Sequence, residues 1–385
     1  MNDPPTVTVN TATVTVNEGQ QANNSGSYGD VDGDEVTLTA SIGTVTKNNI
    51  GTWSWSFTTT DGPAQNQTVT ITANDGNGGT ASATFTLTVQ NVPLTATLSN
   101  TGPVDEGSPV TVSFSNQSDP SSGDTTAGFR YAFSCTNGDL SGATDATSSA
   151  SGSTSCTFAD NGTYTVKGHI VDKDGGFTEY TTQVTVNNVP PTITSLSVAV
   201  VSRTTTSPLN GPVPAGTTIQ VTVSFTDPGS VDTHTGTIYW DWTTYADSST
   251  STGGVSTVCS STSTSTSCSL ASSADGSTKS FIASYKYMSA SVYTIRVTVQ
   301  DKDGGMDDEK YEYVVVYDPS AGFVTGGGWI DSPLRACKLS EACQGATGSA
   351  NFGFVSKYQK GAKVPTGETE FQFKAGNLNF HSTAY

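Results

Sequence analysis

Tyr164-Thr-Val-Lys-Gly-His-Ile-Val171, followed by Asp172-Lys-Asp-Gly-Gly176 and Tyr180-Thr-Thr-Gln-Val-Thr-Val186, is the stretch that decides the fold. Apolar and polar residues alternate in much of the first and last segments, which predicts strands with one buried face. The Asp/Gly-rich segment between them predicts a tight turn. Together the three segments predict a β-hairpin.

The same hairpin pattern occurs at two other places in the chain. Its turns are Asn74-Asp-Gly-Asn-Gly-Gly79 and Asp301-Lys-Asp-Gly-Gly305, each flanked by alternating segments. Proline-containing phrases follow these hairpins and predict linkers between repeated units. These phrases are Asn91-Val-Pro-Leu94, Asn188-Val-Pro-Pro191 and Tyr317-Asp-Pro319, and Asn2-Asp-Pro-Pro5 opens the chain in the same way.

The repeat predicts an all-β chain of three tandem immunoglobulin-like β-sandwiches plus a C-terminal β-rich module. Units of roughly 100 residues match the size of an immunoglobulin-like sandwich. The third unit is longer because of a Ser/Thr-rich tract, Ser248 to Ser280, which we interpret as an insertion. The predicted boundaries are 1–92, 93–189, 190–319 and 320–385, and the last module is expected to be incomplete or completed by a neighbouring chain.

Composition excludes several classes of function. The formal net charge is −18, from 34 acidic and 16 basic residues, and such a chain repels nucleic acid. No apolar run is long enough to span a bilayer, and no secretion signal opens this stretch. The linker-like start and the end just after an alternating run indicate either a piece of a longer protein or a terminal strand that completes its sheet with a neighbouring copy.

The cysteines form three pairs that are close in sequence, and we predict three disulfides: Cys135 with Cys156, Cys259 with Cys268, and Cys337 with Cys343. Disulfides persist in oxidising compartments, so we expect an extracellular or cell-surface location.

Two of the units resemble polycystic-kidney-disease (PKD) domains. The third does so through Phe225-Thr-Asp-Pro-Gly-Ser-Val-Asp-Thr-His234 and Trp240-Asp-Trp242, and the second through Phe114-Ser-Asn-Gln-Ser-Asp-Pro120. The third departs from the usual Trp-Gly-Asp-Gly turn of that family. The first unit is similar to cadherin-like bacterial repeats, through Val16-Asn-Glu-Gly19 and Asp30-Val-Asp-Gly-Asp34.

The end of the chain, from Gly322 to Gly376, is similar to a β-rich module that often follows such repeats in bacterial surface proteins. The resemblances imply β-sandwich folds that serve as extracellular spacers and binding modules. No activity is implied for the last module.

The acidic, glycine-rich turns predict calcium binding, because Ca²⁺ prefers carboxylate and carbonyl oxygens held on tight turns. The cadherin-like resemblance further implies that linker residues share ions between neighbouring units, which would stiffen the chain. The alternative is that the Asp and Asn side chains only cap their own turns. The candidate ligands are Glu18, Asp30, Asp32, Asp34, Asp75, Glu106, Asp119, Asp172, Asp174, Asp227, Asp232, Asp301 and Asp303, with Asn91, Asn188 and Asp318 as bridging linker residues.

Catalysis is not predicted. The histidines His169, His234 and His381 belong to different units, and the chain lacks hydrolase, P-loop and zinc-protease motifs. Trp53 and Trp55 alternate on one predicted strand, where core packing is favoured over a sugar-stacking platform.

Glycosylation is a further prediction, because four asparagines begin N-x-S/T sequons: Asn23, Asn66, Asn116 and Asn161. The Ser/Thr tract is also a candidate for attached sugars.

The leading hypothesis is an extracellular structural or adhesive protein, stiffened by calcium, whose copies polymerise into a fibre by β-strand complementation. Val7-Thr-Val9 and Ala12-Thr-Val-Thr-Val16 are the candidate donor segments. The alternative is a spacer or carbohydrate-binding accessory region of a secreted hydrolase.

Overall fold

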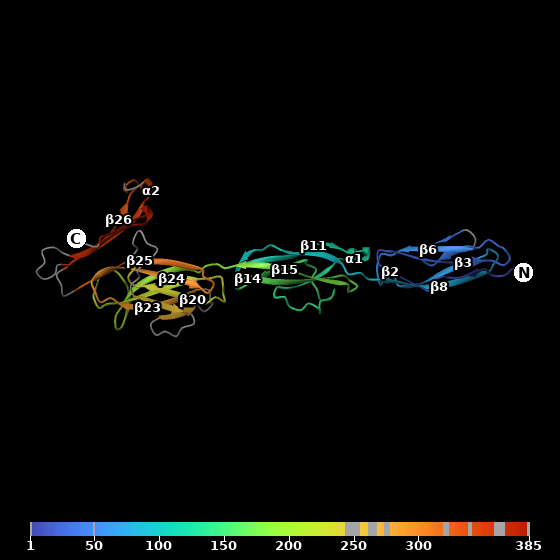
Figure 1. Ribbon diagram of the computed structural model, residues 1–385, viewed down its shortest axis with the longest axis horizontal. Coiled ribbons are helices and arrows are strands. Elements are labelled where there is room, and N and C mark those ends of the chain that lie inside the picture. Colours follow the sequence, from blue (N-terminus) through green and yellow to red (C-terminus); the bar gives the residue numbers. More distant parts are fainter. Residues whose placement is uncertain are drawn as a thin grey trace. The chain divides into compact units, whose positions relative to one another are not determined.

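The computed structural model describes residues 2–48, 51–242, 255–260, 268–272, 278–318, 323–337, 341–357 and 366–382. The chain divides into two compact units, Met1–Asn187 and Asn188–Tyr385. Strands make up most of both units, as the alternating sequence predicts (Figure 1). No helix in these described ranges is long and apolar enough to cross a membrane.

The N-terminal part of the first unit is a sandwich of two four-stranded sheets. Their strand orders are β1-β3-β6-β5 and β2-β8-β7-β4. The predicted hairpin around Asn74–Gly79 is β7–β8, which pairs antiparallel. The strands are β1 (Thr6–Val7), β2 (Thr13–Asn17), β3 (Gln21–Gly29), β4 (Thr37–Ala40), β5 (Thr44–Lys47), β6 (Thr52–Thr58), β7 (Gln67–Asn74) and β8 (Thr80–Gln90).

Trp53 and Trp55 on β6 form the centre of this first sandwich. They are 0% and 1% exposed, and Trp55 packs edge-on against Phe85 at a centroid distance of 4.9 Å. The indole Nε1 of Trp53 donates to Thr8 O (3.1 Å), and that of Trp55 donates to Ile42 O (2.7 Å). Both tryptophans therefore belong to the core, and the sugar-stacking alternative is excluded for them.

The second sandwich lies in the same unit and has sheets β10-β15-β14-β12 and β13-β11-β9. The disulfide Cys135–Cys156 ties the segment after β12 to β13, and so links the two sheets. A short helix, α1 (Ser122–Ala127), follows β11. The strands are β9 (Thr95–Asn100), β10 (Val104–Asp105), β11 (Pro109–Ser118), β12 (Arg130–Ser134), β13 (Ser153–Thr157), β14 (Gly162–Val171) and β15 (Phe177–Asn187).

The third sandwich opens the second unit, with sheets β17-β16-β19-β23-β22 and β18-β25-β24-β20-β21. Its strands are β16 (Thr192–Val201), β17 (Thr206–Pro208), β18 (Val213–Pro214), β19 (Thr218–Thr226), β20 (His234–Tyr239), β21 (Ser256–Ser260), β22 (Cys268–Ser272), β23 (Lys279–Lys286), β24 (Ser291–Asp301) and β25 (Met306–Tyr317).

The Ser/Thr tract, interpreted above as an insertion, contributes to this sandwich. Its described parts include β21 and β22, the edge strands of the two sheets. The disulfide Cys259–Cys268 joins these strands, and both half-cystines lie in the hydrophobic core. Alternating small residues suffice for an edge strand that a disulfide fixes in place, which is why composition alone was misleading. The rest of the tract lies outside the described residues.

The C-terminal module is one four-stranded sheet in the order β26-β27-β28-β29. Its strands are β26 (Phe323–Ser332), β27 (Gly348–Lys357), β28 (Thr366–Phe373) and β29 (Leu378–Ser382), and it also holds α2 (Glu341–Gln344), η1 (Lys374–Gly376) and the disulfide Cys337–Cys343. Gln372 Nε2 donates to Glu312 Oε1 on β25 (2.6 Å), so the sheet contacts the third sandwich.

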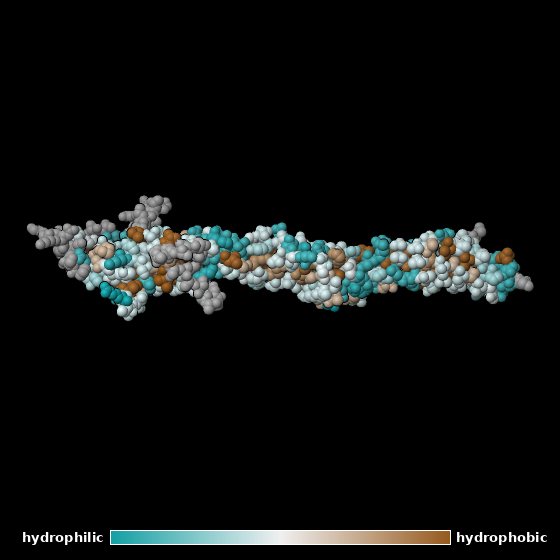
Figure 2. Space-filling model, turned by 90° about the horizontal axis from the view of Figure 1, so that it is seen from below, coloured by the Kyte–Doolittle hydropathy of each residue, from teal (hydrophilic) through white to brown (hydrophobic). Residues whose placement is uncertain are grey.

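Figure 2 shows mostly hydrophilic and intermediate residues on the face in view, with hydrophobic residues in small groups.

Candidate metal centre between the first two sandwiches

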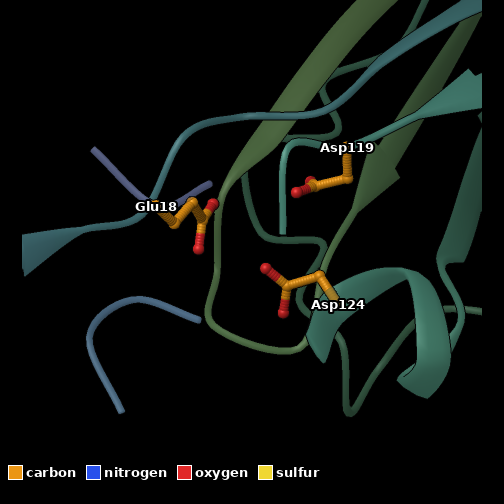
Figure 3. A group of neighbouring side chains, drawn as sticks. All are labelled: Glu18, Asp119 and Asp124. Carbon is orange, nitrogen blue, oxygen red and sulfur yellow. The ribbon is translucent and has the colours of Figure 1, made fainter. Parts of the chain in front are cut away.

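Three carboxylates meet where the first sandwich faces the second, within the first unit. Glu18 lies on the turn between β2 and β3, Asp119 follows β11, and Asp124 lies on α1. One oxygen from each lies within 4.8 Å of the others. Figure 3 shows the three side chains converging from these separate segments.

Backbone groups hold Glu18 in this position. The side chain is 1% exposed, and its carboxylate accepts hydrogen bonds from Gly62 N (2.9 Å) and Val92 N (2.8 Å). Burial raises the pKa of Glu18, while these two hydrogen bonds act in the opposite direction. Because Val92 belongs to the linker, Glu18 fixes the point at which the chain leaves the first sandwich.

Ser121 connects Asp119 to Asp124. Its N donates to Asp119 Oδ1 (2.7 Å), and its Oγ accepts from Asp124 N (3.0 Å), which caps the helix. The same Oγ donates to Thr60 O of the first sandwich (2.8 Å). Burial, followed by the charges of Glu18 and other nearby carboxylates, raises the pKa of Asp119 to about 6.

Asp124 supplies the strongest indication that this group of carboxylates binds a cation. The residue is 0% exposed. Its Oδ1 lies 3.1 Å from Lys173 Nζ, an ion pair rather than a hydrogen bond, and its Oδ2 has no hydrogen-bond partner among the described residues. A buried carboxylate oxygen without a partner is costly, unless a cation completes its environment. The donor set here is all oxygen, which is what Ca²⁺ requires.

The linker residue Asn91 contacts the same end of the second sandwich. Its Nδ2 lies 3.3 Å from both carboxylate oxygens of Asp172, which is 0% exposed. Asp172 also accepts from the backbone N of Asp174 and of Gly176, each at 2.8 Å, so it forms the turn expected of an Asx residue. The Oδ1 of Asn91 is buried without a hydrogen-bond partner among the described residues.

A second group of candidate ligands lies at the other end of the first sandwich. Asp30, Asp34 and Asp75 place one oxygen each within 4.8 Å of the others. Asn2 Nδ2 donates to Asp75 (2.8 Å), as Asn91 does to Asp172, and Asp32 Oδ2 accepts from Asp3 N (2.7 Å). Here too the candidates lie together, next to a linker-like segment.

In the third sandwich, basic side chains of the chain itself already pair with several candidates. His234 Nε2 lies 2.7 Å from Asp227 Oδ2, and Lys302 Nζ lies 2.5 Å from Asp232 and 2.7 Å from Asp303. Asn188 Nδ2 donates to Asp301 (3.0 Å). Of the two remaining candidates, Glu106 follows β10 and Asp318 follows β25.

Sequence reasoning missed Asp61, Asp124 and Lys173. A signal for Asp124 was present, because Asp119-Pro-Ser-Ser-Gly-Asp124 has the same spacing as Asp227-Pro-Gly-Ser-Val-Asp232, and Asp232 was predicted. Asp61 lies in a loop after β6 with no recurring pattern, so only the structure reveals it.

The four sequon asparagines and the three histidines lie at separate places in the structure. The side chains of Asn23, Asn66 and Asn116 are exposed, and Asn161 is half-buried. Glycan attachment at these four sequons stays a prediction.

His169 is buried beside Glu179, His234 pairs with Asp227, and His381 pairs with Glu370.

Three sandwiches follow one another along the chain, and each consists of two sheets and contains the repeated hairpin. The chain is therefore a tandem array of immunoglobulin-like β-sandwiches. Residues 2–88, in the first sandwich, match the family model described as a bacterial Ig domain. The PKD-like character of the second and third sandwiches stays a prediction. No curated protein matches the chain.

Several solved structures are similar to parts of the chain at low identity. The N-terminal Ig1-2 module of the Drosophila receptor protein tyrosine phosphatase DLAR is 15% identical, with a TM-score of 0.19, over 48% of this chain and all of that one. Protocadherin gammaB7 EC3-6 is 10% identical, with a TM-score of 0.27, over 82% and 100%. The Yersinia pseudotuberculosis adhesin InvE is 14% identical, with a TM-score of 0.24, over 55% and 77%.

Proposed function

We propose that the chain is an extracellular structural or adhesive repeat protein in which Ca²⁺ stiffens the junction between the first and second sandwiches. The observation that carries this proposal is the buried Oδ2 of Asp124, which has no partner among the described residues and lies in a group of converging carboxylates. Glu18, Asp119 and Asp124 would hold the ion, with the Oδ1 of Asn91 available nearby from the linker.

The physical effect follows from where these ligands come from. Glu18 belongs to the first sandwich, while Asp119 and Asp124 belong to the second. Without a divalent ion, these carboxylates repel one another across the junction, and Lys173 offsets the repulsion at Oδ1 of Asp124. A divalent ion would convert that repulsion into attraction and would restrict bending of the linker between the two sandwiches.

Calcium titration of the full chain tests this proposal. We expect Ca²⁺ to raise the unfolding midpoint of the first unit, because an ion at about 100 times its Kd stabilises the folded state by about 2.7 kcal/mol. Asp124→Asn should remove most of this gain. Asp139→Asn is the matched control, since Asp139 is an exposed aspartate of the same sandwich whose carboxylate accepts from Ser141.

The controls separate the site from general charge effects in this acidic chain. Equal calcium responses from wild type, Asp124→Asn and Asp139→Asn would mean that the ion binds elsewhere, and the proposal would fail. Magnesium should give a smaller effect, because it demands a tighter octahedral geometry than separate loops provide.

Assembly into a fibre is the second part of the proposal, and the edge strand β26 supports it. β26 forms one edge of the C-terminal sheet, and its Trp329 and Ile330 are 64% and 51% exposed. An exposed edge with large apolar side chains can accept a strand from another copy. The predicted donors are less suitable, because β1 and β2 already pair with β3 and β8 in the first sandwich.

A charge on this edge tests assembly. Ile330→Lys should abolish concentration-dependent association in sedimentation velocity, because an edge lysine opposes strand addition. Val258→Lys is the control, since Val258 is 55% exposed on another edge strand, β21. Wild-type chains that stay monomeric at high concentration, with and without calcium, would refute assembly while leaving the calcium site untouched.

The three disulfides support the extracellular location, because together they use all the cysteines of the chain. The charge of −18 disfavours nucleic-acid partners.

A further inference from the structure

Lys173 lies in the middle of a second group of carboxylates at the same junction. Its Nζ is 2.7 Å from Asp61 Oδ1 of the first sandwich and 3.1 Å from Asp124 Oδ1 of the second, and it also contacts Asp174. One oxygen each from Asp61, Asp124 and Asp174 lies within 4.8 Å of the others. The lysine ammonium therefore lies where a metal ion would find three carboxylate ligands.

The two groups of carboxylates share Asp124, but only one of them contains a cation from the chain. Oδ1 of Asp124 faces the ammonium group, while Oδ2 has no partner among the described residues. We call the Asp61–Asp124–Asp174 group the lysine half of the junction, and the Glu18–Asp119–Asp124 group the open half. The junction thus combines a position already neutralised by Lys173 with one that is not.

The turn that carries Lys173 fixes the backbone from which its side chain projects. Asp172 accepts from the N of Asp174 and the N of Gly176, which closes the turn around Lys173. At Gly176, a Cβ atom would lie 2.3 Å from Asp172 Oδ2, so a larger residue would displace the carboxylate that closes the turn. A rigid turn delivers the ammonium group to the junction without a large cost in backbone entropy.

The repeats themselves provide an internal comparison. In the third sandwich, Asp301-Lys-Asp-Gly-Gly305 directs Lys302 to Asp232 in the same way. The first sandwich has Gly76 at the equivalent position of Asn74-Asp-Gly-Asn-Gly-Gly79, and its Asp30–Asp34–Asp75 group has no lysine in the turn. The acidic turn of the first sandwich therefore forms without a lysine, while the turns of the second and third sandwiches carry one.

We propose that Lys173 is a resident cation that competes with divalent ions for the lysine half of the junction. This inference rests on the proposed calcium function. In the ion-free protein, the ammonium group holds the two sandwiches together through Asp61 and Asp124. When calcium is present, one ion enters the open half, and the lysine keeps a second ion out of the other half.

Removing the charge of Lys173 should lower stability in chelator and strengthen calcium binding. In chelator, Lys173→Met should lower the unfolding midpoint of the first unit, because Asp124 then loses its ion-pair partner. In calcium, the same variant should bind one more ion per chain than wild type, or bind calcium about tenfold more tightly, since a nearby positive charge has been removed.

The experiment is isothermal calcium titration of the full chain, with chelator unfolding curves measured in parallel. Lys173→Arg should behave as wild type, because it keeps the charge, and it also guards against misreading a folding defect. Lys167→Met is the matched control, since Lys167 lies on β14 of the same sandwich and pairs with Glu179 instead of with the junction.

Each outcome decides a different point. Extra or tighter calcium binding by Lys173→Met, with wild-type behaviour of the two lysine controls, supports the inference. Unchanged binding by Lys173→Met, while Asp124→Asn still abolishes wild-type binding, overturns the inference and leaves the calcium function standing. No Asp124-dependent binding in either wild type or Lys173→Met overturns both.

Discussion

His234 Nε2 lies 2.7 Å from Oδ2 of Asp227 in the third sandwich, and both side chains are almost fully buried. By sequence spacing, Asp227 is equivalent to Asp119, and His234 is equivalent to Thr126. His234, at the start of β20, thus supplies an imidazole partner in the third sandwich, whereas Oδ2 of Asp119 has no hydrogen-bond partner among the described residues. This difference makes Asp119 the better candidate for a metal ligand.

His234→Ala should therefore destabilise the second unit by about 3 kcal/mol, because it leaves the buried Oδ2 of Asp227 without its imidazole partner, while Oδ1 keeps its bond from Gly229 N. Urea unfolding of the second unit, followed by hydrogen exchange of peptides from residues 188–385, measures this loss. Thr233→Ala is the neighbouring control at an exposed position and should change little. Equal stability of the two variants would show that the pair contributes nothing.

The ion-free first unit should become more stable as the pH falls. Asp119 has a pKa of about 6 in the folded state, against an ordinary value of 3.8, and burial also raises the pKa values of Glu18 and Asp172. A folded-state pKa above the unfolded value means that the folded state binds protons more tightly. The stabilisation is complete below about pH 4 and is lost as the pH rises through about 6.

Urea midpoints of the first unit in chelator, measured between pH 4 and pH 7, test this sign. Asp119→Asn should flatten the profile in that window, since it removes the carboxyl group whose pKa is raised to about 6. Calcium should reverse the trend, because protons and the ion compete for the same carboxylates. A midpoint that rises with pH in chelator, and does so equally in Asp119→Asn, would contradict the assignment.

Trp53 tests the core of the first sandwich. Trp53→Ala should cost about 3–5 kcal/mol of folding free energy, as expected for a fully buried aromatic residue. Trp329→Ala, at a 64% exposed tryptophan, should change stability by less than about 0.5 kcal/mol. Similar costs at the two positions, measured by thermal unfolding, would contradict the burial described above.

The sequence was sufficient to predict the strands that carry period-two alternation. The segment Tyr164–Val171 lies within β14, and Tyr180–Val186 lies within β15, with the acidic turn between them. Such predictions succeed because the alternation within a single strand indicates which of its side chains are buried. The disulfides were predictable for a related reason, since each pair lies within 21 residues.

The site was less predictable, because its residues come from different sandwiches. Glu18 and Asp61 lie in separate loops of the first, while Asp124 and Lys173 lie in separate segments of the second. No local pattern states which loops of two sandwiches will face each other. The Ser/Thr tract was hard to predict for another reason. The core position of Cys259 depends on its disulfide to Cys268 in the other sheet, and the composition around it does not indicate this.

Distance measurement across the first junction tests the central claim most directly. Spin labels on Thr84→Cys and Thr181→Cys, both at exposed strand positions, would report on the first and second sandwiches, and the native cysteines are all in disulfides. We expect calcium to narrow the distribution of label distances in the otherwise wild-type chain and to leave it broad in the Asp124→Asn background. A distribution that calcium does not change, or that narrows equally in both backgrounds, would contradict a calcium-stiffened junction.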